Sequence, residues 1–286
     1  MQKIGLVLEG GASRGVFTAG VLDYWMEQGI SFPYVVGVSA GACNAADLVS
    51  RQIGRTRRTM IHKEKAYRYA GFRTFWKTRQ WMDMDLLFDL FPQEYFPFDF
   101  DTYFSSDTFV EYGCTECTTG KAIFLREQQD PKRLMQILRA SCAMPGAVKP
   151  VTVDGKEYVD GGLSDSIPIR RAFAMGCSKV VVIQTRGAQF RMKPSSSARL
   201  IGSMYRKYPA IRQALRRRPI RYNRTLNTII ALEQKQKVLS LRPTIPEVKR
   251  MEQDYGTLMR FYHHGYTQAK GHMEELRRFL QEDTTR

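Results

Sequence analysis

Apolar and polar positions follow a regular order over the first fifty residues. Two short runs, Lys3–Leu8 and Tyr34–Val38, are almost wholly apolar, which is typical of strands buried on both faces of a parallel sheet. A stretch with helical spacing follows each run, Val16–Gln28 after the first and Ala40–Arg51 after the second. This order of strand, glycine-rich turn, helix, strand, sharp turn and helix predicts an α/β fold with a parallel sheet.

The rest of the chain continues this alternation less regularly. Further apolar runs predict strands at Ala122–Arg126, Lys156–Val159, Lys179–Thr185 and Val238–Arg242. Helical spacing predicts helices at Pro131–Ala143, Ile167–Met175 and Asp254–Gln281, the last one broken near Gly265 and Gly271. Residues 52–110 predict helices and irregular segments beside the sheet. We expect a core at residues 1–185 and a basic, helical region at residues 186–286 packed on the same domain.

Length and composition restrict the class of protein. The chain has 286 residues, 43% of them hydrophobic, which is enough for one large α/β domain or two smaller ones. No apolar run approaches the roughly 18 residues that cross a bilayer, and the N-terminal run is too short for a signal peptide. We therefore expect a cytoplasmic protein, peripheral at the inner face of the membrane. The five cysteines argue against a disulfide framework, and the lone C-x-x-C at Cys114 and Cys117 predicts no metal site.

The net charge of +16 is concentrated in two segments. Residues 51–79 carry ten Lys and Arg against one acid, and residues 186–224 carry twelve and no acid. Such segments favour an anionic partner, namely a phospholipid surface, a phosphorylated substrate or a nucleic acid, although a solvated basic face has the same composition. In the second segment, the spacing of Leu200, Met204 and Ile211 predicts an amphipathic helix that lies on an anionic membrane surface.

The strongest chemical signal is a G-x-S-x-G motif formed by Gly37, Ser39 and Gly41. It lies between a predicted strand and a predicted helix, where a nucleophile elbow requires small residues on either side of the serine. The N-terminus of the following helix favours negative charge that develops beside the serine. This placement predicts that Ser39 is a catalytic nucleophile.

A glycine-rich turn after the first strand contains Gly10, Gly11, Ala12, Arg14 and Gly15. Its backbone N–H groups are candidates for an oxyanion hole next to the elbow. A nucleotide-binding loop is the rival interpretation. A P-loop needs Lys and Ser or Thr after the glycines, and a dinucleotide fingerprint needs a third glycine and an acid after the second strand. The sequence has neither, so we predict an oxyanion hole rather than a nucleotide-binding loop.

A third motif, Asp160, Gly161 and Gly162, also follows a predicted strand. An aspartate that leaves a strand into glycines can turn back over the edge of the sheet. A structural turn uses the same residues, so the local sequence leaves both interpretations open.

These three motifs stand in an order that resembles one known family, the patatin-like phospholipases. The residues that carry the resemblance are Gly10-Gly11-x-x-Arg14-Gly15, Gly37-x-Ser39-x-Gly41 and Asp160-Gly161-Gly162. The stretch Ala140–Gly146, together with Tyr158–Leu163 and Ile167-Pro168, also looks like it. The resemblance covers roughly residues 3–185 and is nearest to the bacterial cytosolic members.

The resemblance implies a three-layer α/β/α fold with a mainly parallel central sheet. It also implies hydrolysis of fatty-acyl esters in phospholipids or lysophospholipids through an acyl-enzyme, with no metal or organic cofactor. By the match, Ser39 is the nucleophile, Asp160 is its partner in a dyad, and Gly10, Gly11 and Ala12 form the oxyanion hole. The family usually has a third glycine at position 12. Alanine keeps the N–H group but restricts the backbone.

Two other interpretations remain open. A Ser-His-Asp esterase would use a late histidine, His263 or His264, although both stand in a predicted helix rather than in a loop after a strand. A basic membrane-binding or nucleic-acid-binding protein would carry an inactive elbow. Tyr205, Tyr208 and Tyr222 stand among basic residues, but no nucleic-acid motif accompanies them, so we expect no nucleic-acid partner. The sequence predicts neither the lipid head group nor the oligomeric state.

Overall fold

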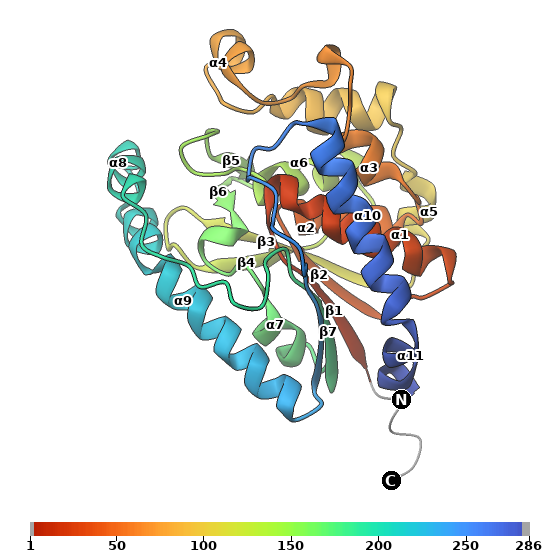
Figure 1. Ribbon diagram of the computed structural model, residues 1–286. Helices are drawn as coiled ribbons and strands as arrows, with labels where there is room; N and C mark the ends of the chain where they lie inside the picture. The colour runs from red at the N-terminus through yellow and green to blue at the C-terminus, as the bar shows by residue number, and fades with distance from the viewer. Residues whose placement is uncertain (1–2, 282–286) are drawn as a thin grey trace.

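The computed structural model describes residues 3–281, without the side chain of Arg73. Its centre is an eight-stranded sheet in the order β5-β6-β3-β2-β1-β7-β8, with β4 paired to β3 off this path (Figure 1). The strands are β1 (Ile4–Leu8), β2 (Tyr34–Val38), β3 (Phe109–Glu116), β4 (Ala122–Leu125), β5 (Val151–Val153), β6 (Lys156–Asp160), β7 (Lys179–Ile183) and β8 (Val238–Leu241). The pairs among β1, β2, β3, β7 and β8 are parallel, whereas the pairs that β4, β5 and β6 form are antiparallel.

Helices cover both faces of this sheet. The α-helices are α1 (Gly15–Glu27), α2 (Ala40–Val49), α3 (Arg55–Met60), α4 (Phe72–Thr78), α5 (Phe100–Phe104), α6 (Pro131–Ser141), α7 (Ile169–Ala174), α8 (Ser197–Met204), α9 (Pro209–Gln234), α10 (Tyr255–Gly271) and α11 (Met273–Gln281). Shorter helical segments are η1 (Ala12–Arg14), η2 (Lys65–Tyr67), the π-helix η3 (Leu86–Tyr95) and η4 (Gly161–Leu163). Within the described range, no helix is both long and apolar enough to cross a membrane.

The strand β1 shows how the three layers form. Successive side chains of a strand point to opposite faces, so Leu6 and Leu8 pack into one core and Val7 into another. The first core includes residues of α1, α2, α6 and α10, and the second includes residues of α7 and α9 (Figure 1). Because both faces are buried, the central strands are apolar throughout. The predicted α/β class with helices on both faces of a mainly parallel sheet is confirmed.

Close packing of α10 against α1 explains one departure from the predicted helices. A Cβ on Gly265 would lie 2.1 Å from the carbonyl oxygen of Phe17, and one on Gly20 would lie 2.1 Å from that of Tyr262. These glycines let the two backbones approach each other. The predicted break near Gly265 is therefore wrong, since α10 continues through it and ends only at Gly271.

The basic segment at residues 186–224 differs from the predicted amphipathic helix. It forms α8 and the start of α9, with a break between them. Leu200 and Met204 on α8 are 72% and 67% exposed, but Ile211 on α9 is 0% exposed and belongs to a small core with Leu163 and Ala214. One continuous apolar face through these positions was thus a wrong prediction, because the chain turns inward after α8.

Candidate active site

The turn between β2 and α2 places Ser39 at the carboxyl end of the parallel strands. Ser39 has φ of 55° and ψ of −124°, a strained conformation for a residue with a side chain. A Cβ on Gly37 would lie 2.3 Å from the carbonyl oxygen of Gly41, and one on Gly41 would lie 2.4 Å from that of Leu8. The glycines of the motif are therefore required by close backbone contacts, as a nucleophile elbow demands.

Asp160 reaches the same place from the opposite direction. At the end of β6, which runs antiparallel to β3, Asp160 stands opposite Cys114. The neighbouring Gly113 pairs with Val38, the residue before the elbow. Because β3 extends beyond β2, β6 returns along that extension and ends level with the elbow. Gly161 follows where a Cβ would lie 2.1 Å from the carbonyl oxygen of Gly113.

The two side chains meet in a direct hydrogen bond. The Ser39 hydroxyl donates to Oδ2 of Asp160 over 2.7 Å, and the N–H of Gly162 donates to Oδ1 over 2.7 Å. Burial raises the pKa of Asp160 above its usual range, and these two hydrogen bonds oppose that rise. A carboxyl with a raised pKa, in contact with a serine hydroxyl, has the geometry of a general base for that hydroxyl.

The backbone of the elbow is held by Ser141, a residue to which the sequence assigned no role. The N–H of Ser39 donates to the hydroxyl of Ser141 over 2.9 Å, and that hydroxyl donates to the carbonyl oxygen of Gly113 over 2.7 Å. Ser141 thus joins the elbow to β3 from the end of α6. It stands in the Ala140–Gly146 stretch, so its only signal in the sequence was the family resemblance.

The glycine-rich turn lies beside the elbow, since a Cβ on Gly10 would be 3.2 Å from that of Ser39. The N–H of Gly10 already donates to the carbonyl oxygen of Ser166 over 3.3 Å. The N–H groups of Gly11 and Ala12 have no acceptor among residues 3–281. Ala12 has φ of 49°, the left-handed conformation that a glycine adopts readily. Two of the three expected oxyanion donors are therefore available.

Arg14 and Gly15 support the turn rather than face the serine directly. A Cβ on Gly15 would lie 2.7 Å from the Cβ of Ala40, so the start of α1 packs tightly against the start of α2. Arg14 is almost fully buried, and its Nε has no hydrogen-bond partner within the described residues. This buried, unsatisfied donor distinguishes Arg14 from an ordinary helix residue.

An apolar pocket opens at the dyad and includes both Ser39 and Asp160 in its lining. Most of its wall comes from α2, α6 and the segment before β3. The larger apolar side chains of the wall are Met82, Phe88, Phe91, Phe98, Met135 and Leu138. A cavity of this composition, with a few polar groups at one end, suits an acyl chain whose ester lies at the serine.

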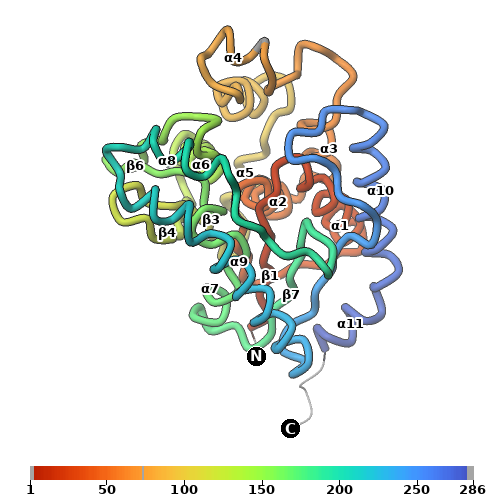
Figure 2. The backbone as a smooth tube through the Cα atoms, turned by 60° about the vertical axis from the view of Figure 1, so that its left-hand side comes forward, coloured from red at the N-terminus to blue at the C-terminus, as the bar shows by residue number. Residues whose placement is uncertain are grey.

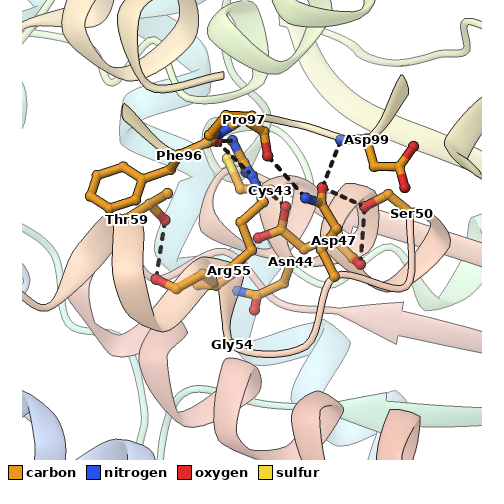
Figure 3. Close-up of polar contacts among 12 residues, drawn as sticks. Cys43, Asn44, Asp47, Ser50, Gly54, Arg55, Thr59, Phe96, Pro97 and Asp99 are labelled. Atoms are coloured by element: carbon orange, nitrogen blue, oxygen red, sulfur yellow. Dashed lines mark hydrogen bonds and ion pairs between the residues drawn. The ribbon is translucent and has the colours of Figure 1, made fainter. Parts of the chain in front are cut away.

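The other end of this pocket is formed by a buried ion pair. Asp47 lies on α2 eight residues after Ser39, about 12 Å along the helix axis. Its Oδ1 is 2.8 Å from Nη1 of Arg55, and its Oδ2 accepts from the hydroxyl of Thr56 over 2.5 Å. Arg55 also donates to the carbonyl oxygen of Phe96 (Figure 3). These charges are fully paired, so they serve as a polar wall where the pocket ends.

The structure does not bring a histidine to the dyad. On α10, His264 accepts at Nε2 from the N–H of Thr244 over 3.0 Å and packs beside the ring of Phe17, and His263 is exposed. Neither lines the cavities around Ser39. No group of three or more His, Cys, Asp or Glu side chains is placed to hold a metal ion anywhere in residues 3–281.

Comparison with known proteins agrees with this geometry. The family model described as Patatin-like phospholipase matches residues 6–173. The chain belongs to the patatin-like phospholipase family. At the level of family, the predicted class of enzyme, a hydrolase of lipid esters, is confirmed. Residues 208–281 match a second model, a domain of unknown function (DUF6363), so the C-terminal part of this patatin-like chain is also a recurring unit.

Relatives of the chain are bacterial and fungal. YjjU, an uncharacterised protein of Escherichia coli (strain K12), is 32% identical over 67% of this chain and 54% of its own length. The lysophospholipase NTE1 of Kluyveromyces lactis is 23% identical over 95% of this chain, but that match spans only 19% of the yeast protein. The crystal structure of VipD from Legionella pneumophila superposes with a TM-score of 0.52 at 13% identity, over 96% of this chain and 67% of VipD, which shows a shared fold.

Proposed function

We propose that this protein is a serine acyl hydrolase that cleaves fatty-acyl esters of phospholipids or lysophospholipids. The observation that carries the proposal is the 2.7 Å hydrogen bond from Ser39 to Asp160 at the mouth of an apolar pocket. Membership of a phospholipase family and the similarity to proteins named lysophospholipase support the choice of substrate class. Among residues 3–281, no histidine lines either cavity, which favours a dyad over a triad.

In the first half of the reaction, Oγ of Ser39 attacks the carbonyl carbon of the ester, and its proton passes to Oδ2 of Asp160. The N–H groups of Gly11 and Ala12 stabilise the negative charge on the carbonyl oxygen, and one such donor is worth about 2.7–4 kcal/mol. The bond to the leaving alcohol then breaks. Asp160 returns the proton to that alcohol, and the acyl group remains on Ser39.

In the second half, a water molecule gives a proton to Asp160 and attacks the acyl carbon. The bond to Ser39 breaks, the proton returns from Asp160 to Oγ, and the fatty acid leaves. The raised pKa of Asp160 brings the carboxyl closer to the strength that both proton transfers need.

A fluorophosphonate probe and a lysophospholipid substrate test the proposal together. The wild type should be labelled and should release fatty acid. Ser39→Ala should lose both properties, whereas Ser105→Ala, which alters an exposed serine, should retain both. Labelling that persists in Ser39→Ala, or hydrolysis at the wild-type rate, would show that the nucleophile lies elsewhere.

We also propose that the enzyme meets its substrate at an anionic lipid surface on the cytoplasmic side, with residues 1–185 and 186–286 acting as one unit. Leu200 and Met204 on α8 project into solvent within the basic segment, as Phe72 and Trp76 do on α4. Both helices lie on the side of the molecule toward which β2 leads into α2 (Figures 1 and 2). Exposed apolar side chains among cations are the pattern of an interfacial anchor.

Vesicle sedimentation tests this surface. Binding should be stronger to anionic than to zwitterionic vesicles and should weaken as salt is added. Leu200→Glu with Met204→Glu should reduce it. Ile220→Glu, which alters an exposed apolar residue on α9, is the matched control and should not. Equal binding to both kinds of vesicle would refute the proposal.

A further inference from the structure

A second cavity adjoins the dyad, and its chemistry differs from that of the acyl pocket. Both cavities are lined by Ala12, Ser39, Met144 and Asp160, so they meet at the reacting groups. The second one also receives the side chains of Arg14, Arg218 and Arg250. We call these three residues the arginine cluster. An ester held at Ser39 with its acyl chain in the apolar pocket would direct its alcohol portion toward this cluster.

The arginine cluster is built from three separate parts of the chain. Arg14 follows the glycine-rich turn, Arg218 lies in α9, and Arg250 lies in the loop before α10. The carbonyl oxygen of Arg250 accepts from the N–H of Ser13, which fastens that loop to the glycine-rich turn. Nε of Arg218 donates to the carbonyl oxygen of Gly162, two residues after Asp160. The first contact holds the backbone of Arg250 beside the glycine-rich turn, and the second holds the guanidinium group of Arg218 next to the dyad.

Within residues 3–281, none of the three arginines forms an ion pair, although eleven ion pairs exist elsewhere. Nε of the buried Arg14 has no partner, and Arg250 donates only to the thioether sulfur of Met144, a weak acceptor. Burial, together with the charges of Arg186 and Arg250, lowers the pKa of Arg14 to about 10. Burial and the charge of Arg250 also lower the pKa of Arg218.

The nearby acids do not balance these charges. Glu9 attracts Arg14, but its carboxylate is occupied by the hydroxyl of Tyr222 and the N–H of Thr185, and burial raises its pKa. Asp160 attracts Arg218 and Arg250 but is engaged with the elbow. Glu247 is paired with Arg186. Three converging and partly buried cations without a paired anion constitute a site that a ligand anion would stabilise.

We propose that the arginine cluster binds the phosphate of the substrate, so that the C-terminal region supplies the head-group half of the active site. This inference rests on the proposed lipid hydrolase. A guanidinium group can donate two parallel hydrogen bonds to the oxygens of one phosphate. Within residues 3–281, no carboxylate takes this place beside the arginine cluster. In a glycerophospholipid, the phosphate lies on the alcohol side of the ester, opposite the acyl chain. An apolar cavity and an arginine-lined cavity that meet at Ser39 suit the two parts of such a substrate.

Substrate selectivity tests the proposal. The comparison uses a monoacyl glycerophosphate and a monoacylglycerol with the same acyl chain. The wild type should show a higher kcat/KM for the phosphorylated ester. Arg250→Gln should lower the ratio of the two kcat/KM values by at least about tenfold, as expected for a lost hydrogen bond to a charged group, and Arg250→Lys should restore part of it. Arg217 is exposed on α9 and is the matched control, so Arg217→Gln should keep the wild-type ratio.

Free phosphate and an inactive variant separate the remaining explanations. Calorimetry with Ser39→Ala should show binding of glycerol phosphate that is lost in Ser39→Ala with Arg250→Gln. This readout needs no turnover, so it still tests the cluster if the hydrolase proposal fails. A site for inorganic phosphate alone would bind that ion without preferring the phosphorylated ester, and this outcome would overturn the proposal. Equal ratios in Arg250→Gln and Arg217→Gln would also overturn it.

Discussion

Asp160→Asn should abolish turnover and at the same time stabilise the folded protein at neutral pH. Asparagine keeps the shape of the side chain, and its oxygen can still accept from the N–H of Gly162. The nitrogen that then faces Ser39 has no lone pair for a proton. Since the wild-type carboxylate accepts from the serine hydroxyl over 2.7 Å, its loss removes the general base, which is worth about 10²–10⁴-fold in rate.

The gain in stability follows from the direction of the pKa shift. Burial raises the pKa of Asp160 above 3.8, so ionisation costs free energy in the folded protein that it does not cost in the unfolded chain. The contribution of Asp160 to the free energy of unfolding is therefore most favourable below pH 3.8. It becomes less favourable as the pH rises through the folded-state pKa. Asparagine removes this loss. The advantage of the variant should be present at pH 7.5 and should vanish toward pH 3.8.

Asp165 is a matched control on the same segment. Burial raises its pKa from 3.8 to about 6, but it has no contact with the dyad. That difference of about two pH units corresponds to at most about 3 kcal/mol, which is fully expressed above pH 6 and absent below pH 3.8. Asp165→Asn should therefore gain stability in the same direction as Asp160→Asn, while its kcat stays at the wild-type value.

Urea unfolding at pH 7.5 and pH 4, together with kcat for a lysophospholipid, measures both effects. Turnover by Asp160→Asn within tenfold of the wild type would refute its role as base. A loss of stability at pH 7.5 in Asp160→Asn would refute the argument from burial. If Asp165→Asn lost activity as well, the loss in Asp160→Asn would be caused by disturbance of this segment of the chain and not by removal of the proton acceptor.

Further variants test other parts of the site. Ala12→Gly should gain about 1 kcal/mol in urea unfolding, because glycine adopts the positive φ without strain, and it should keep its activity because the N–H remains; lost activity would show that the methyl group matters. Arg55→Met should lose about 3–5 kcal/mol, because Asp47 is left buried without its cation, and unchanged stability would contradict this. His263→Ala with His264→Ala should keep most of the hydrolytic activity, and its loss in a folded variant would favour a triad.

The direction of β6 shows where prediction from sequence reaches its limit. The pattern around Lys156–Val159 predicted a strand, and the glycines after Asp160 predicted a turn, both correctly. That Asp160 would meet Ser39 was expected from two strands ending at one edge. The structure reaches the same contact through an antiparallel strand that uses the overhang of β3. The direction of a strand depends on the strands with which it pairs, and these can be distant in the sequence. The local spacing of apolar residues therefore does not predict it.

The C-terminal region was harder to predict for a related reason. Its helices were visible from spacing, but which apolar residues face inward depends on what each helix packs against. Ile211 has the same spacing as the exposed Leu200 and Met204, yet it is buried against Leu163. In the same way, nothing in the sequence distinguishes Arg218 from its neighbour Arg217, although only Arg218 lies against the dyad segment.

The buried acids of this protein have two kinds of partner, arginines and hydrogen-bond donors without charge. Away from the dyad, the buried Asp47 is paired with Arg55 and the buried Glu111 with Arg171, whereas Asp23 is buried with hydrogen bonds from the N–H of Gly54 and the hydroxyl of Tyr262. These pairs hold α2 to the following segment and β3 to α7. Like Asp23, Asp160 accepts from one hydroxyl and one backbone N–H, but its hydroxyl partner is that of Ser39 at the elbow.

Backbone strain distinguishes the dyad from the rest of the fold more clearly. Ser39 and Ala12 hold positive φ angles side by side at the buried end of the sheet, whereas the other non-glycine residues with positive φ among residues 3–281 stand next to helix ends or in a hairpin turn: Arg51, Arg79, Asp154 and Gln236. An unpaired carboxyl, two strained residues and an unsatisfied arginine within one small region all lower stability. Features that lower stability are retained where they serve a reaction. Their coincidence around Ser39 is therefore a physical argument for catalysis that does not depend on any motif.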